Sequence, residues 1–105
     1  MEKRTPHYDL ARIQANVARM GATAFTKTAL DGGRTMGLTT AEMLAVIATL
    51  TRRDFSKSMT TYSDHRVWQD VYHVPSPAGV LYVKFTADAV TEFLLLSFKE
   101  KEEPS

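Results

Sequence analysis

Residues Lys57 to Tyr72 read KSMTTYSDHRVWQDVY, and they mark the point where the apolar pattern of the chain changes from a helical to a strand period. A lysine and several hydroxyl residues precede a turn at Asp64-His65, and a strand pattern begins at Trp68. A segment that only connects two elements does not need so many charged and hydrogen-bonding side chains. The stretch therefore indicates a functional surface as well as a structural boundary.

The composition is that of an ordinary globular protein. The 105 residues are 44% hydrophobic, so we expect one domain over 1–105, with a solvated tail at 100–105. There is no cysteine, which excludes disulfides and favours a reducing compartment. No signal segment is apparent and no apolar run approaches the length of a membrane span, so we expect a cytoplasmic protein. With a net charge of only +1, an anion site must use a few placed cations.

Helical spacing dominates the first third of the chain. Thr5 and Pro6 suit a helix start, and apolar residues then recur every three or four positions until Gly21. A short second helix is predicted over 25–30. We expect the run Asp31-Gly32-Gly33 to interrupt it as a turn, because glycine is unfavourable inside a helix.

The second half of the chain is predicted to be a sheet. Residues 39–42, TTAE, match the capping-box pattern and open a third helix. A strand then begins near Lys57, and three further segments, 68–74, 80–86 and 93–100, are rich in β-branched, aromatic and aliphatic residues. Helices followed by strands predict an α+β fold, in which N-terminal helices pack on one face of a curved, mainly antiparallel sheet.

Alternation along these strands predicts which side chains share a face. The large apolar residues assigned to the helix-covered face are Trp68, Tyr72, Leu81, Val83, Phe85, Leu94, Leu96 and Phe98. The other face is then open, and we expect it to gather Lys57, Gln69, Tyr82, Lys84 and Lys99, with Phe93, Leu95 and Ser97 also on that side. Asp70 falls on the covered side and would need a hydrogen-bonding partner there.

The open-face set has the chemistry of a phosphate or nucleotide site. It combines cations, a phenol that can donate a hydrogen bond or stack on a base, and an amide. An exposed sheet face of a small protein also carries such residues for solubility alone, so the pattern by itself leaves both interpretations open. The histidines, His7, His65 and His73, are widely spaced, and no metal site is predicted.

Three segments, MEKRTPH, FSKSMTTYSDHRVWQDVYH and LLSFKEK, closely resemble the MqsR family of bacterial toxins, and the similarity covers nearly the whole chain. The resemblance implies a RelE-like fold and an endoribonuclease that cleaves messenger RNA at GC-containing triplets without the ribosome. We expect no cofactor, and no metal is required if ammonium groups supply the electrostatic stabilisation. The resemblance also implies an MqsA-like antitoxin with a zinc-binding domain and a helix-turn-helix domain, through which the complex binds its own operator DNA. Biofilm formation and persistence are the associated phenotypes.

The family's catalytic positions match four residues of this chain: Lys57, Gln69, Tyr82 and Lys99. Three more side chains are expected to contact RNA: Lys84, His73 and Tyr62. Our hypothesis is that the two catalytic lysines hold the scissile phosphate, while the phenol and the amide orient it for attack by the RNA 2′-hydroxyl. The alternatives are a non-catalytic module that binds RNA or protein through the same face, and a structural subunit with no ligand.

Overall fold

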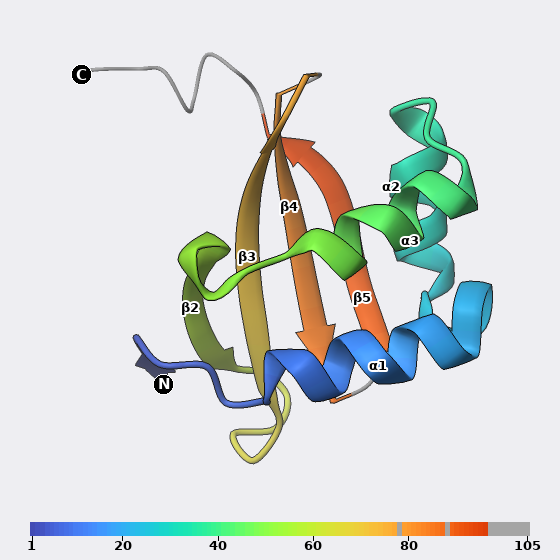
Figure 1. Ribbon diagram of the computed structural model, residues 1–105. Coiled ribbons are helices and arrows are strands. Elements are labelled where there is room, and N and C mark those ends of the chain that lie inside the picture. The colour runs from blue at the N-terminus through green and yellow to red at the C-terminus, as the bar shows by residue number, and fades with distance from the viewer. Residues whose placement is uncertain (78, 88, 97–105) are drawn as a thin grey trace.

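The computed structural model describes residues 1–77, 79–87 and 89–96. Its main elements, in chain order, are β1 (Glu2–Lys3), α1 (Leu10–Met20), α2 (Lys27–Thr35), α3 (Thr40–Thr49), β2 (Phe55–Thr60), β3 (Trp68–Ser76), β4 (Gly79–Thr86) and β5 (Ala89–Leu96). All neighbouring strands are antiparallel, in the order β1-β2-β3-β4-β5 (Figure 1). The predicted α+β class is confirmed. No helix in the described ranges is both long and apolar enough to span a membrane.

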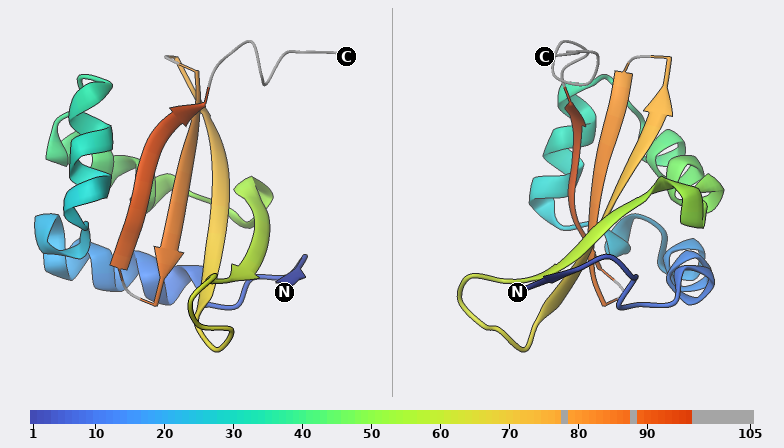
Figure 2. Two further views of the ribbon diagram at one scale, coloured as in Figure 1. Left: turned by 180° about the vertical axis from the view of Figure 1, so that it is seen from behind. Right: turned by 90° about the vertical axis from the view of Figure 1, so that its left-hand side faces the viewer.

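One face of the sheet is covered by α1 and α3, which lie across the strands, whereas α2 runs beside β5 (Figures 1 and 2). The side chains that are almost fully buried in the core between these layers are Ile13, Val17, Met43, Ile47, Tyr72, Val83, Phe85, Val90 and Phe93. Their burial removes a large apolar surface from water and is the main contribution to the stability of the fold. On the opposite face of β2, β3 and β4, the described part of the chain places no helix (Figure 2).

The first helix starts later than the sequence predicted. Asp9 is its N-cap, with a side-chain oxygen that accepts a hydrogen bond from Ala11 N, so a start at Thr5 and Pro6 is wrong. The preceding backbone is held in another way, because its N–H groups at His7 and Tyr8 donate to a carboxylate of the sheet. A tertiary contact therefore overrides a reasonable local start signal.

The second helix contains the two glycines that were expected to end it. α2 runs through Gly32 and Gly33 to Thr35, so the predicted turn at 31–33 is wrong. A Cβ atom on Gly32 would lie 1.9 Å from the backbone oxygen of Phe93, and one on Gly33 would lie 2.2 Å from Met43 Sδ. The glycines lower helix propensity by about 1 kcal/mol each, but they permit α2 to pack closely on β5 and α3.

The last strand faces the opposite way from the prediction, up to the point where the structure describes it. Phe93 is 1% exposed and pairs with Val83 on the covered face, whereas Leu94 pairs with Tyr82 on the open face and is 37% exposed. Four successive apolar residues, FLLL, offer no polar alternation from which to read a face. The alternation therefore gives no support to the predicted place of Lys99, which lies outside the described residues.

Candidate active site

The open face of the sheet brings two lysines into one cross-strand row. Lys57 on β2, Val71 on β3 and Lys84 on β4 are register partners, so their side chains project on the same side. Two strand spacings separate the lysine backbones by about 10 Å. Val71 between them is fully buried, so the two lysines flank an apolar floor.

The neighbouring rows carry the other predicted polar groups. On one side, Gln69 pairs with Met59 of β2. On the other side, His73 pairs with Tyr82 of β4, and the centroids of their rings are 5.6 Å apart. The register therefore brings Lys57, Gln69, His73, Tyr82 and Lys84 onto a single face, while the part each plays in chemistry stays a prediction.

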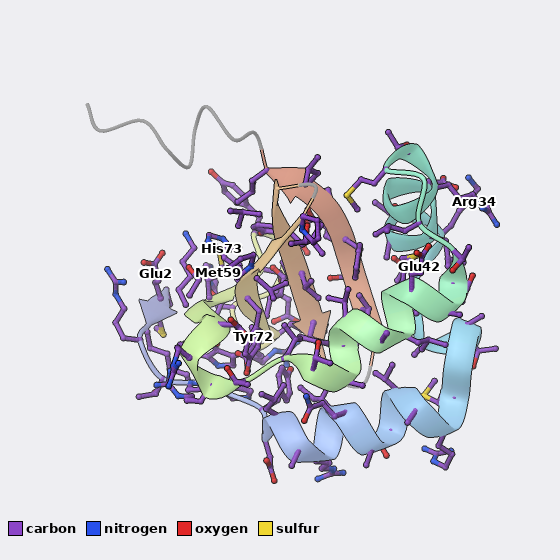
Figure 3. All side chains as sticks on the ribbon, turned by 45° about the horizontal axis from the view of Figure 1, so that its top comes forward. Glu2, Arg34, Glu42, Met59, Tyr72 and His73 are labelled. Carbon is purple, nitrogen blue, oxygen red and sulfur yellow. The ribbon has the colours of Figure 1, made fainter. Side chains whose placement is uncertain are left out.

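A groove opens at the β1 side of this face, with a volume of about 540 Å³. Its lining residues are Met1, Glu2, Met59, Thr60, Thr61, Tyr62, Gln69 and Lys84. Tyr62 lies in the β2–β3 loop and is fully exposed, so its ring is available at the rim. Figure 3 shows Glu2 and Met59 next to each other, with His73 on the same side of the molecule.

Each lysine of the row forms an ion pair with a carboxylate from an outer strand. Lys57 Nζ lies 3.7 Å from Glu2 Oε1, with the lysine side chain 38% exposed. Lys84 pairs with Glu92 of β5, and its side chain is only 12% exposed. The Lys57 pair is the more open to solvent, so an incoming anion can exchange with its carboxylate at little cost.

Sequence reasoning missed both carboxylates. Glu92 precedes the segment predicted as the last strand, and Glu2 lies in a strand of two residues whose partner, Met59, is more than fifty positions away. The signal that places Glu92 is its pairing with Lys84 across the β4–β5 hairpin, which depends on a bulge in that ladder. The two-residue strand offers no periodicity from which a pairing can be predicted.

The phenol of Tyr82 is electrostatically suited to donate a hydrogen bond. Burial raises the pKa of this phenol above its usual value, and the nearby Glu92 carboxylate raises it further. Tyr82 therefore stays neutral around physiological pH, as a hydroxyl that can donate to a phosphate oxygen and not as a phenolate base.

Asp70 ties the N-terminal arm, residues 1–8, to the sheet. Its carboxylate is fully buried and accepts hydrogen bonds from His7 N at 3.0 Å, Tyr8 N at 2.9 Å and Ser58 Oγ at 2.6 Å. The predicted need for a partner is confirmed, because three donors satisfy this charge. The arm is thereby fixed along β2, which sets Met1 and Glu2 in the wall of the groove.

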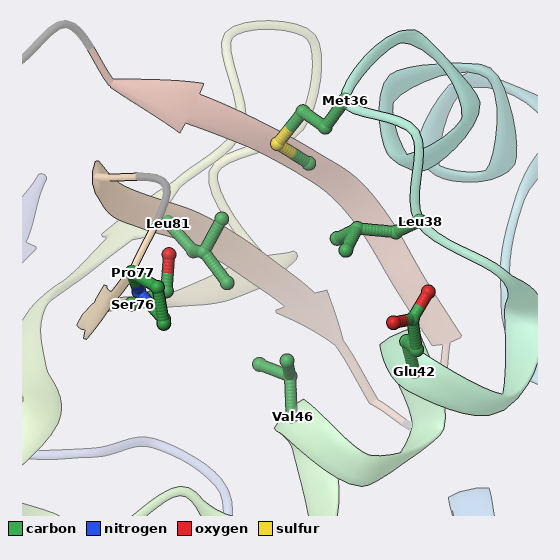
Figure 4. A pocket seen from close by; sticks show the side chains of 7 residues that line it. All are labelled: Met36, Leu38, Glu42, Val46, Ser76, Pro77 and Leu81. Atoms are coloured by element: carbon green, nitrogen blue, oxygen red, sulfur yellow. The ribbon is translucent and has the colours of Figure 1, made fainter.

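A second cavity, of about 300 Å³, lies near α3 and the β3–β4 hairpin (Figure 4). Its lining is mostly apolar and includes Met36, Leu38, Val46 and Leu81, with Glu42 as a charged member. The residues that line this cavity include no lysine or arginine, whereas those of the groove on the open face include Lys84. The groove on the open face is therefore the better candidate for a polyanionic ligand.

The sequence is similar to known proteins over nearly its whole length. The family described as "Motility quorum-sensing regulator, toxin of MqsA" matches residues 5–100. A curated protein of Escherichia coli (strain K12), named "mRNA interferase toxin MqsR", is 44% identical over 101 residues, which cover 96% of this chain and 100% of that protein.

Proposed function

This chain belongs to the MqsR family of toxins, and on that premise we propose that it arrests growth by cutting messenger RNA on its open sheet face. It is an endoribonuclease, with RNA as its substrate and an antitoxin as its protein partner. One observation supports the choice of site: Lys57, Gln69 and Tyr82 project from one face beside a groove.

In the proposed reaction the RNA supplies its own nucleophile. The 2′-oxygen bonds to the adjacent phosphorus while the bond between phosphorus and the 5′-oxygen breaks. The 2′-hydroxyl proton passes to a base and the leaving 5′-oxygen takes up a proton, which gives a 2′,3′-cyclic phosphate and a 5′-hydroxyl end. The protein has to hold the phosphate in line for attack and to stabilise its additional negative charge.

The proposal assigns Lys57 and Lys99 to the phosphate. Lys57 suits this role because its ion pair with Glu2 is exposed and weak, so phosphate can replace the carboxylate. Two ammonium groups would supply the electrostatic stabilisation without a metal ion. Lys99 lies outside the described residues, and its role is supported by the resemblance of its SFKEK segment to the family.

Tyr82 and Gln69 are assigned to orientation of the substrate. The raised pKa of Tyr82 keeps it a hydrogen-bond donor, and a nonbridging phosphate oxygen is the matching acceptor. Gln69 lies between the groove and the lysine row, where its amide can hold a ribose or phosphate oxygen.

Three further residues are proposed to contact RNA beside the cut. The exposed ring of Tyr62 can stack on a base at the rim of the groove. Lys84 is held by Glu92 and adds positive charge to the groove wall. His73 lies against Tyr82 in the next row, on the face along which the RNA strand is proposed to run.

The resemblance of the KSMTTYSDH and WQDVY segments to the family supports finer parts of the proposal. We expect cleavage at GC-containing triplets, without a ribosome, in the cytoplasm. We expect the antitoxin to be an MqsA-like protein with a zinc-binding domain and a helix-turn-helix domain, which binds operator DNA for the complex. An adjacent reading frame that encodes such a protein is the observation expected from the genome.

The test is an incubation of purified protein with a defined messenger RNA, with and without EDTA. We expect strand scission in both, with 2′,3′-cyclic phosphate ends. An RNA with 2′-O-methyl ribose on the 5′ side of the scissile phosphate should resist cleavage, because its nucleophile is blocked. Loss of all cleavage in EDTA, or cleavage of the 2′-O-methyl RNA at that bond, would contradict the mechanism.

The alternative, a module that binds RNA without cutting it, predicts a different result in the same incubation. The RNA would stay intact, and its binding would weaken steeply with salt, as expected for contacts between lysines and phosphates. A structural subunit would neither bind nor cut. The incubation therefore separates the three functions.

A further inference from the structure

We infer that the groove beside Lys57 is a subsite for a guanine base of the RNA, and that Glu2 is the residue that reads this base. The inference rests on the proposed RNA cleavage and names the part of the substrate that the groove selects. Glu2 is the carboxylate in the groove wall, where the other lining side chains are neutral or, in Lys84, cationic.

The strand register sets Glu2 in the same cross-strand row as Met59 and Gln69. All three side chains line the groove, so the carboxylate and the amide approach a bound ligand from two sides of an apolar thioether. The volume of about 540 Å³ falls within the usual range for small-ligand sites, roughly 300–1,000 Å³. An aromatic ring, Tyr62, lies at the rim and can stack on a flat base.

The backbone that carries Glu2 is held on both sides. Before it, Met1 O accepts a hydrogen bond from Thr60 N at 2.9 Å. After it, His7 N and Tyr8 N donate to the buried Asp70 carboxylate. A carboxylate on a backbone fixed in this way binds without a further loss of backbone freedom, and such preorganisation favours a selective contact.

The chemistry of a carboxylate selects guanine among the four bases. An ionised carboxylate is an acceptor with two oxygens and no donor. The Watson–Crick edge of guanine offers two adjacent donors, N1–H and the N2 amino group, whereas uracil offers N3–H between two acceptors, and cytosine and adenine each offer an amino group next to a ring acceptor. Single-stranded RNA is commonly read on this edge. Glu2 can therefore form a paired contact with guanine that the other bases do not match.

The same contact links base recognition to the phosphate. In the structure Glu2 Oε1 is 3.7 Å from Lys57 Nζ, so the carboxylate is paired with the ammonium group that is proposed to hold the scissile phosphate. When a guanine forms hydrogen bonds with the Glu2 carboxylate, it replaces the ion pair and leaves the Lys57 ammonium group free to bind the phosphate. Binding of the preferred base and availability of Lys57 are thereby favoured together.

The experiment replaces guanosine by inosine, one position at a time, in a short RNA cut by the full chain. Inosine lacks only the N2 amino group, so kcat/KM for the wild type should fall about tenfold at one position next to the cut. Glu2→Gln should remove this difference at that position, so that both RNAs are cut at the same rate. Unchanged melting curves would show that the variant folds.

Asp31→Asn is the matched control, because it also neutralises an exposed carboxylate in surface ion pairs, on α2, which does not line the groove. It should keep the inosine sensitivity of the wild type. The inference is overturned if Glu2→Gln retains that sensitivity, if it slows all RNAs equally, or if the wild type tolerates inosine everywhere. The proposed endonuclease stands in each of these cases, whereas a wild type that cuts no RNA overturns both.

Discussion

The two faces of the sheet share the same strands and hold opposite kinds of interaction. On the covered face, Tyr72 is fully buried against Phe55 and Phe85, and Asp70 has every contact supplied by the protein itself. On the open face, Lys57 has a partner, Glu2, that an anion can replace. Stability is therefore concentrated on one face and exchangeable charge on the other, so substitutions on the two faces should change different properties.

The largest expected effect is that of Lys57→Ala. Loss of a cation at the phosphate should lower the kcat/KM for RNA cleavage by about 100- to 1,000-fold. The free energy of unfolding should stay nearly unchanged, because this side chain is 38% exposed and its ion pair is weak. Lys27→Ala is the control, since that lysine forms a comparable pair with Asp31 on α2. Equal cleavage by both variants would show that Lys57 and the open face take no part in cleavage.

Asp70→Ala should show the reverse pattern, with stability as the property that changes most. Its removal leaves the donors of His7, Tyr8 and Ser58 without their acceptor, at a cost of about 3 kcal/mol in the free energy of unfolding. Urea denaturation measures this loss. Ser58→Ala, which removes a single donor, should cost about 1 kcal/mol. If Asp70→Ala unfolds at the urea concentration of the wild type, the arm is not fixed by this carboxylate.

Tyr82→Phe tests whether a hydroxyl on the open face contributes to cleavage and not to stability. It removes the proposed hydrogen bond to the phosphate and should lower kcat/KM for RNA about tenfold. Its melting temperature should match the wild type, because Tyr82 lies on the open face and is only partly buried. Single-turnover cleavage and thermal melting measure the two quantities. A large loss of stability with normal cleavage would show that this phenol is structural.

Tyr72→Phe is the matched change on the covered face and has the smallest expected effect. The Tyr72 hydroxyl is buried and has no hydrogen-bond partner among the described residues, so its removal should alter stability by less than about 1 kcal/mol, or increase it. Cleavage should be unchanged. A loss of cleavage equal to that of Tyr82→Phe would break the distinction between the faces.

The pH dependence of Tyr72→Phe should also differ from that of the wild type. Burial, helped by the Asp70 carboxylate, raises the pKa of Tyr72 from 10.0 to about 12. A pKa raised by folding gives stability that is complete below pH 10 and is lost as the pH rises towards 12, because the unfolded chain ionises first. Melting temperatures between pH 8 and pH 11 should therefore fall more steeply for the wild type than for the variant.

The covered face was largely predictable from the sequence. The alternation over 68–74 and 80–86 identifies Tyr72, Val83 and Phe85 as inward residues, because burial selects apolar side chains at every second position. Alternation does not identify the face on which Phe93 lies, because Phe93 belongs to a continuous apolar run. The prediction also fails at Gly32, whose helical place depends on a backbone oxygen of β5 that no local pattern reveals.

The open face was only half predictable. Gln69, Tyr82 and Lys84 follow from strand alternation, and Lys57 from the motif it opens. The carboxylates that face the lysines, Glu2 and Glu92, depend on the register between strands, and register is a tertiary property that composition does not record. The sequence therefore indicated the cations of the site, and the structure supplied their counterions.

The bond between Asp70 and the N-terminal arm spans 63 positions of the chain. During synthesis the arm is therefore made first and docked late, since its anchor exists only after β3 has been translated and has paired with β2. The wall that Met1 and Glu2 give to the groove is then among the last parts to assemble. A nascent chain on its ribosome thus holds an unfinished cutting surface until most of its own message has been read.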